Sequence, residues 1–312
     1  MPPDRGQPSD RGQTSDRGKA TDLGKPRGRD KPTDRGKPIG RPDRRDTGER
    51  ADHADRPNRH RKPRPPAEAA ATTATTTDTT LFGRNAVEEA LRARLRRVHR
   101  IWATQSAASE PWLADASATV EITSADDVAR RAGSDAHQGV CAEVDPYPYA
   151  DAADLLARPE PLIVALDEVQ DPQNLGAICR TAECAGATGV VICERRAAQV
   201  TAAVAKASAG AVEHLPVARV RNLTDFLLEA RDAGAWSYGA AATQAAVPYT
   251  EPDYGGAVVL VLGSEGRGLR RRVAGACDQL IELPMRGRIG SLNVSAAAAA
   301  LLYGILQRRY SA

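Results

Sequence analysis

The chain has 312 residues, enough for two domains, and a formal net charge of +3 at pH 7. It contains no run of about 18 or more apolar residues, so the sequence predicts no transmembrane helix. The five cysteines form no Cys-x-x-Cys pair and have no histidines at metal-ligand spacing, so we predict no metal site. The odd cysteine count and the lack of a signal-peptide pattern favour a reducing, cytoplasmic setting.

Residues 1–80 differ in composition from the rest of the chain. They consist almost entirely of Asp, Arg, Gly, Lys, Pro, Thr and Ala and hold 19 basic and 13 acidic residues, whereas the other 232 residues hold 24 basic and 27 acidic ones. Because such a segment cannot bury an apolar core, we predict a disordered, mixed-charge basic tail. Its role stays open between weak attraction to RNA phosphates and a solubilising extension.

Residues 81–145 alternate between helical and strand patterns. Helices are expected over "NAVEEALRARL", near "EPWLADA" and over "ADDVARRAG", and strands over "VHRIWAT", "VEIT" and "QGVCAEV". This alternation predicts a small α/β domain. Residues 146–160 contain several prolines and little periodicity, so we predict a linker there.

Residues 161–312 are predicted to form a larger α/β domain. Six apolar runs with helical stretches between them are typical of strands: "LIVALDEV", "GVVICE", "HLPVARV", "AWSYGAA", "AVVLVLG" and "LIELPM". Strands that alternate with helices predict a mostly parallel sheet covered on both faces. General rules favour an open, doubly wound sheet, whose ligands bind beyond the carboxyl ends of the strands.

The segment "LDEVQDPQNLGAICRTAECAG" follows the first of these strands. Asp171 and Pro172 form a typical helix start, which explains both without any function. Asn174 falls near the first turn of that helix, and Arg180 lies almost two turns in. Because Arg180 stands among small and apolar residues, where an arginine requires a partner, it is a candidate functional residue.

Two further strand ends carry glycine-rich loops with polar residues. "VLVLGSEGRGLRRRV" places Gly263 at a strand end with Glu265 behind it, and "LIELPMRGRIGSLNV" places Ser291 and Asn293 at the start of the last helix. The first loop has neither the Rossmann glycine order nor the Gly-Lys-Ser/Thr of a P-loop. Helix capping and the helix dipole alone would account for these polar residues. Three such loops, each at a strand end, nevertheless predict one shared pocket.

Together the three loops resemble the three ordered motifs of the SpoU family of RNA ribose 2′-O-methyltransferases, within the SPOUT class. "LFGRNAVEEAL" and "HQGVCAEV" are similar to the two ends of the small substrate-binding domain in the branch that methylates guanosine in 23S rRNA. The resemblance covers residues 81–309. It implies a small N-terminal α/β substrate-binding domain followed by a C-terminal parallel-sheet α/β domain with a deep trefoil knot, a topology nearly absent from other proteins.

The resemblance also implies a cofactor, a partner and a site. S-adenosylmethionine is expected as the methyl donor, and the chain is expected to form a homodimer in which Arg180 serves the partner's site. Because a guanidinium carries no acceptor, we expect Arg180 to stabilise the ribose alkoxide rather than to act as a base. The implied catalytic positions are Asn174, Arg180, Glu265, Ser291 and Asn293, and the implied cofactor positions are Gly263, Leu283, Met285, Leu292 and Ser295.

RNA binding requires basic residues, although the chain beyond residue 80 is slightly acidic. Arginines gather at the start of the small domain, and we predict that Arg84, Arg94 and Arg96 contact RNA. The alternative is that they form a solvated helix face. A second arginine cluster occupies residues 270–272.

The sequence thus predicts methyl transfer from S-adenosylmethionine to a ribose 2′-hydroxyl, most specifically of a guanosine in 23S rRNA. A tRNA or an adenosine of 23S rRNA stays open as the substrate, because base choice depends on pocket contacts. A non-catalytic RNA-binding or ribosome-assembly protein is the alternative from another class, and the complete set of catalytic positions speaks against it. A nucleotide-dependent dehydrogenase is excluded because the glycine fingerprint is missing.

Overall fold

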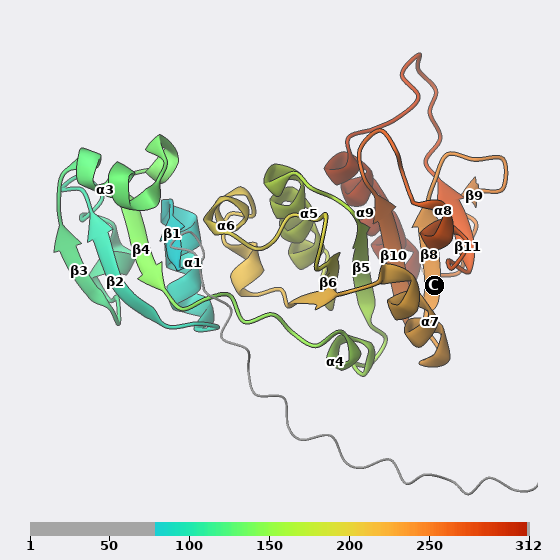
Figure 1. The fold of residues 1–312 in the computed structure, drawn as a ribbon, viewed down its shortest axis with the longest axis horizontal. Helices are drawn as coiled ribbons and strands as arrows, with labels where there is room; N and C mark the ends of the chain where they lie inside the picture. The colour runs from blue at the N-terminus through green and yellow to red at the C-terminus, as the bar shows by residue number, and fades with distance from the viewer. Residues whose placement is uncertain (1–78, 311–312) are drawn as a thin grey trace, which may run out of the picture. The chain divides into compact units, whose positions relative to one another are not determined.

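The computed structural model describes residues 79–310, so the predicted tail lies almost entirely outside the described residues. The small domain forms a four-stranded sheet in the order β1-β4-β2-β3 (Figure 1). Its elements are β1 (Thr80–Phe82), α1 (Arg84–Ala93), β2 (Val98–Ala103), α2 (Pro111–Ala114), β3 (Thr119–Ile122), α3 (Ala125–Ala132), the short 3-10 turn η1 (Asp135–His137) and β4 (Val140–Val144).

The small α/β domain was predicted correctly, with one additional strand. β1 pairs antiparallel with β4, and Leu81 is buried against Val87 and Ile101 in the same core. A strand of three residues is too short to show a period of two, which is why the sequence did not indicate it.

The predicted linker, residues 146–160, contains regular structure. Ala150 bridges to Ala218 in β7 (Val217–Val220), and α4 (Ala152–Leu156) begins at Asp151, whose side chain accepts a hydrogen bond from the Ala153 amide. Tyr147 is buried, and its hydroxyl donates to the carbonyls of Val212 and Leu215. This stretch is therefore packed against the larger domain rather than free of it.

The larger domain is built on a seven-stranded sheet in the order β7-β6-β5-β10-β8-β11-β9 (Figure 1). All its strand pairs are parallel, as predicted. β9, of only two residues, was not predicted. The elements besides β7 are β5 (Leu162–Asp167), α5 (Pro172–Cys184), β6 (Gly189–Cys193), α6 (Ala202–Ala207), η2 (Ala211–Glu213), α7 (Leu223–Asp232), β8 (Trp236–Ala240), β9 (Val247–Pro248), β10 (Val258–Gly263), α8 (Arg271–Ala274), β11 (Gln279–Glu282) and α9 (Val294–Tyr310).

Helices cover both faces of the central strands. Along β5, Val164 and Leu166 belong to the core that contains α5 and α9, whereas Ile163 and Ala165 belong to the core that contains α7 and α8. This alternation follows from the period of two in a strand. It explains why β5 is buried at every position and apolar up to its last residue, Asp167.

The strand order reverses direction between β5 and β10. From β5 the chain adds β6 and β7 on one side, and the later strands β10, β8 and β11 lie on the other side. Such a switch point opens a crevice beyond the carboxyl ends of the two strands, where ligands of parallel sheets bind. The loops after β5 and β10 carry the first and second motifs. The trefoil knot implied by the resemblance stays a prediction.

Candidate active site

The loop after β10 turns sharply because of two glycines. The Gly268 amide donates to the Ser264 carbonyl at 2.9 Å, and Gly268 has a φ of 65°, which glycine adopts without strain. A Cβ on Gly263 would lie 2.1 Å from the Gly268 carbonyl carbon. Only glycine therefore fits at position 263, and the loop folds back over the end of its own strand.

Asp167 and Arg270 hold this loop against β5. Asp167, the last residue of β5, is fully buried. It accepts hydrogen bonds from the Arg270 backbone amide at 2.8 Å and from Arg270 Nε at 2.7 Å. Because a buried carboxylate requires such partners, the pair fixes the C-terminal end of the loop to the neighbouring strand.

Three side chains from the three motif segments form one hydrogen-bonded cluster. Asn174 Nδ2 donates to Glu265 Oε1 at 2.8 Å. Asn293 Nδ2 donates to Asn174 Oδ1 at 3.0 Å and to Glu265 Oε1 at 2.5 Å. Asn174 is buried, and the carboxylate is the common acceptor. The structure thus brings together one predicted catalytic residue from each of the three motifs.

Asn293 also caps the last helix. Its Oδ1 accepts hydrogen bonds from the Ser295 backbone amide at 2.8 Å and from the Ser295 hydroxyl at 2.6 Å. One side chain therefore satisfies the exposed amides at the start of α9 and, through its Nδ2, joins the cluster with Glu265. The capping and site interpretations of this residue are compatible.

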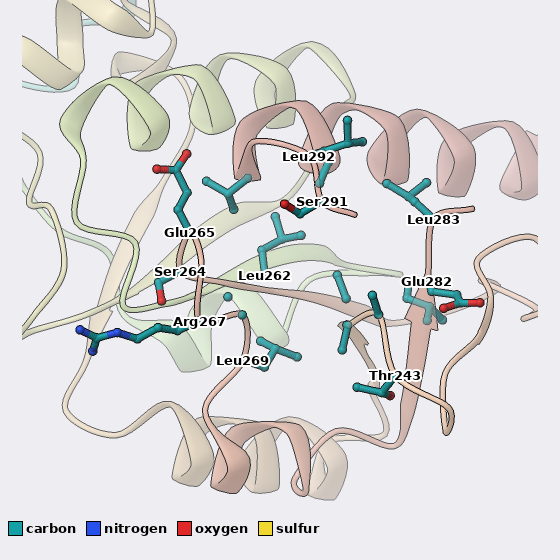
Figure 2. Close-up of a pocket in the computed structure, with 18 of the residues that line it drawn as sticks. Thr243, Leu262, Ser264, Glu265, Arg267, Leu269, Glu282, Leu283, Ser291 and Leu292 are labelled. Atoms are coloured by element: carbon teal, nitrogen blue, oxygen red, sulfur yellow. The ribbon is translucent and has the colours of Figure 1, made fainter. Parts of the chain in front are cut away.

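A pocket of about 660 Å³ lies beside the cluster, between the loop after β10 and the segment before α9 (Figure 2). Ligand pockets of roughly 300 to 1,000 Å³ accommodate small molecules. Six of the predicted site residues in addition to Asn293 line it: Gly263, Glu265, Leu283, Met285, Ser291 and Leu292. Ser295, predicted to contact the cofactor, is not among the lining residues, because its hydroxyl is turned to Asn293.

Further lining residues were not predicted. Ala240 ends β8, Ala241, Ala242 and Thr243 come from the loop after it, and Glu282 ends β11. In Figure 2, Thr243 lies across the pocket from Ser291 and Leu292. Glycine beside a polar residue marks the other strand ends in the sequence, whereas the β8 loop has small alanines instead of glycine.

Arg180 lies apart from the cluster. It is exposed on α5, and no hydrogen bond or ion pair joins it to another residue within 79–310. The expectation that an arginine in this helix needs a partner is thus not met within the described part of one chain.

The small domain's arginines differ in what surrounds them. Arg94 is exposed, whereas Arg84 forms an ion pair with Glu110. Arg96 is buried: its Nη2 lies 2.5 Å from Glu213 Oε1, and the two side chains are 4% and 0% exposed. The prediction that Arg96 contacts RNA is therefore wrong, because its charge is already neutralised inside the protein. Sequence alone did not reveal Glu213, 117 residues away, as its partner.

No metal site or membrane span is found among the described residues. Within residues 79–310, no group of three or more His, Cys, Asp or Glu side chains is arranged to hold a metal ion. No helix in this range is long and apolar enough to cross a membrane.

The family of the chain follows from comparison with known proteins. The model of the SpoU rRNA Methylase family matches residues 161–303, and the model for RNA 2′-O ribose methyltransferase substrate binding matches residues 80–150. The chain is 47% identical over 178 residues to Bacillus subtilis YacO, provisionally named a TrmH family tRNA/rRNA methyltransferase. The aligned region covers 55% of this chain and 71% of YacO. This chain belongs to the SpoU methylase family.

Other relatives agree with this assignment. A Staphylococcus aureus protein, also provisionally named a TrmH family tRNA/rRNA methyltransferase, is 41% identical over 179 residues, or 56% of this chain and 72% of the relative. An S-adenosylmethionine-bound rRNA methyltransferase from Sinorhizobium meliloti aligns with a TM-score of 0.64 and 28% identity over 75% of this chain and 88% of that one. The SpoU methyltransferase AviRb from Streptomyces viridochromogenes shares the fold, with a TM-score of 0.64 and 24% identity over 75% and 91% of the two chains.

The SpoU chain described here is an RNA methyltransferase whose cofactor is S-adenosylmethionine. Its pocket fits this molecule. Leu283 and Leu292 offer apolar contacts, and Leu292 is 48% exposed. Gly263, Gly266 and Gly268 add exposed backbone to the lining beside Leu262 and Leu269, and glycine permits a close approach of a ligand to the backbone. Thr243, Glu282 and Ser291 add polar side chains to the same lining.

Proposed function

We propose that this SpoU chain methylates the 2′-hydroxyl of a guanosine in 23S rRNA. The cluster of Asn174, Glu265 and Asn293 at the rim of the cofactor pocket carries the proposal, because it places oriented polar groups beside the methyl donor's site. The choice of 23S rRNA and of guanosine rests on the resemblance of "LFGRNAVEEAL" and "HQGVCAEV" to the small domain of that branch, and the family model for substrate binding, which matches residues 80–150, supports RNA as the substrate class.

The reaction requires alignment of two reactants and removal of a proton from a weakly acidic hydroxyl. S-adenosylmethionine supplies a methyl group on a positively charged sulfonium. The ribose oxygen forms the new bond to this methyl carbon while the carbon–sulfur bond breaks and leaves a neutral thioether. We assign the positioning of the ribose to Asn293 and Ser291, and the orientation of both asparagines to Glu265.

Arg180 is proposed to stabilise the developing alkoxide of a partner subunit's substrate. It is exposed and has no ion pair within the described residues of its own chain. A guanidinium is a strong hydrogen-bond donor that stays charged at ordinary pH. It is therefore suited to stabilise an anion and not to accept a proton. The proton leaves to water or to a nearby RNA phosphate. This assignment requires a homodimer.

The small domain is proposed to grip RNA through Arg94. Arg94 is exposed at the C-terminal end of α1, beside a hollow that Arg97 also lines. Structured RNA is recognised mainly by shape and by its 2′-hydroxyls, which a small domain beside the catalytic domain is suited to read.

A tRNA is the second candidate substrate, because the relatives are named tRNA/rRNA methyltransferases. An incubation of the purified chain with methyl-labelled S-adenosylmethionine decides between the two substrates. The RNA is supplied in separate reactions as transcripts of 23S rRNA, 16S rRNA and tRNA. We expect label in 23S rRNA that survives alkaline hydrolysis within a dinucleotide containing guanosine. Label in tRNA alone would contradict the rRNA assignment, and label recovered in mononucleotides after alkaline hydrolysis would contradict ribose methylation.

A further inference from the structure

A second hollow lies at the same edge of the sheet as the active site. It has a volume of about 680 Å³, and its lining comprises six arginines and two carboxylates. The arginines come from the segments after β6 and β7 and from around α8: Arg195, Arg196, Arg221, Arg270, Arg271 and Arg272.

Not all of these arginines are available to a ligand. Arg270 is committed to Asp167 and Glu168, and Arg196 lies 3.7 Å from Glu168. Arg221 lies 3.7 Å from Glu194. Arg195, Arg271 and Arg272 are exposed and form no ion pair with any residue in the described part of the chain. Three guanidinium groups thus face one hollow without a carboxylate partner.

The arginine hollow connects to the catalytic cluster through shared residues. Glu168 lines both the arginine hollow and a smaller pocket that also contains Asn174 and Glu265. That smaller pocket shares Ser264, Glu265 and Arg267 with the cofactor pocket. The three hollows are therefore neighbours along the carboxyl ends of the strands, with the smaller pocket between the cofactor pocket and the arginine hollow.

We infer that the arginine hollow binds backbone phosphates of the RNA strand adjacent to the methylated nucleotide. This inference rests on the proposed RNA methylation. Unpaired guanidinium groups bind phosphate bidentately, and such contacts fix the register of a strand without reading its sequence. The hollow supplies the local positive charge that the slightly acidic body requires, whereas in the small domain Arg84 and Arg96 are neutralised by carboxylates.

The test compares the wild type with Arg195→Gln and the double variant Arg271→Gln/Arg272→Gln. Arg158→Gln is the matched control, because Arg158 is exposed, has no ion pair within residues 79–310 and lies outside the hollow. The probe is a 23S rRNA transcript in filter-binding titrations over a range of salt concentrations. S-adenosylmethionine affinity, measured by calorimetry without RNA, reports whether each variant is folded.

Each lost phosphate contact is expected to reduce the slope of log K against log salt by roughly 0.7 to 0.9. The double variant is expected to bind the transcript at least about tenfold more weakly, with unchanged cofactor affinity and with Arg158→Gln like the wild type. An unchanged slope and affinity in both hollow variants would overturn the inference. Failure of the wild type to methylate any RNA would overturn the proposed function instead, so the two failures are distinguishable.

Discussion

Asn174 and Glu265 are 91 residues apart in sequence, and their side chains are joined by a hydrogen bond of 2.8 Å. The bond spans the switch point of the sheet, since Asn174 follows β5 and Glu265 follows β10. Asn293 completes the cluster from the start of α9. Each of the three residues is held by the other two, so the cluster is expected to act as a unit.

Loss of any one member is therefore expected to cost nearly as much as loss of two. Asn174→Ala and Glu265→Ala should each lower the rate of methyl transfer about a hundredfold, and the double variant should be only slightly slower, because groups that act together are not additive. Single-turnover rates measure this. Gln173→Ala, on the exposed side of the same helical turn, is the control. Fully additive losses would contradict a cooperative cluster.

Gly263 is expected to tolerate no side chain. In Gly263→Ala the new Cβ would lie 2.1 Å from the Gly268 carbonyl carbon, so the loop must shift, at a cost of about 1 to 3 kcal/mol in folding free energy. Cofactor affinity, measured by calorimetry, should fall at least tenfold. Gly287→Ala, where nothing lies within 4 Å, should behave like the wild type. Equal affinity for both variants would show that the loop's path is not part of the cofactor site.

Arg180 should be needed by the opposite subunit. Arg180→Ala and Asn293→Ala are each expected to be inactive alone. When the two are unfolded and refolded together, mixed dimers contain one intact site, and activity should return to about a quarter of the wild-type value. As the control, each variant is unfolded and refolded alone at the same total protein concentration. Differential tags verify that mixed dimers have formed. If these dimers show no activity, Arg180 acts in its own chain's site or has no role in catalysis.

The buried pair of Arg96 and Glu213 is expected to stabilise the fold rather than to bind RNA. Arg96→Met leaves a buried carboxylate unpaired and should lower the free energy of unfolding by about 3 to 5 kcal/mol, measured with urea. Arg92→Met removes an exposed helix-surface arginine and should cost less than about 1 kcal/mol. The pair variant Arg96→Met/Glu213→Leu should recover part of the loss. If Arg96→Met were as stable as the wild type but bound RNA more weakly, Arg96 would contact RNA, as the sequence predicts.

Cysteine reactivity should follow burial. Burial raises the pKa of the Cys141 thiol to about 11 and that of Cys179 to about 12, so near neutral pH almost none of either is thiolate, the reactive form. Cys184 is exposed. Iodoacetamide at about pH 8 should label Cys184 first, as peptide mass spectrometry can show, and the buried thiols should react only at more alkaline pH or after unfolding. Rapid labelling of Cys179 in the folded protein would contradict its burial in α5.

The fold was largely predictable because its strands are apolar, evenly spaced and separated by amphipathic helices. Elements of two or three residues, β1 and β9, carry no period and were missed. The site residues at glycine-rich strand ends were predicted, because glycines and polar side chains stand together there in the sequence. Thr243 was missed because its loop lacks glycine. Arg96 was misjudged because the burial of a charged side chain depends on a carboxylate 117 residues away.

The cluster around Asn293 is expected to form the site at which a ribose in 23S rRNA is methylated. The most direct measurement maps 2′-O-methyl groups across 23S rRNA in cells that carry the wild-type gene, lack it, or carry Asn293→Ala. We predict that the same guanosine loses its methyl group in both altered strains and keeps it in the wild type. If no position in 23S rRNA changes, the proposed substrate is wrong. If only the deletion strain changes, Asn293 is not part of the catalytic site.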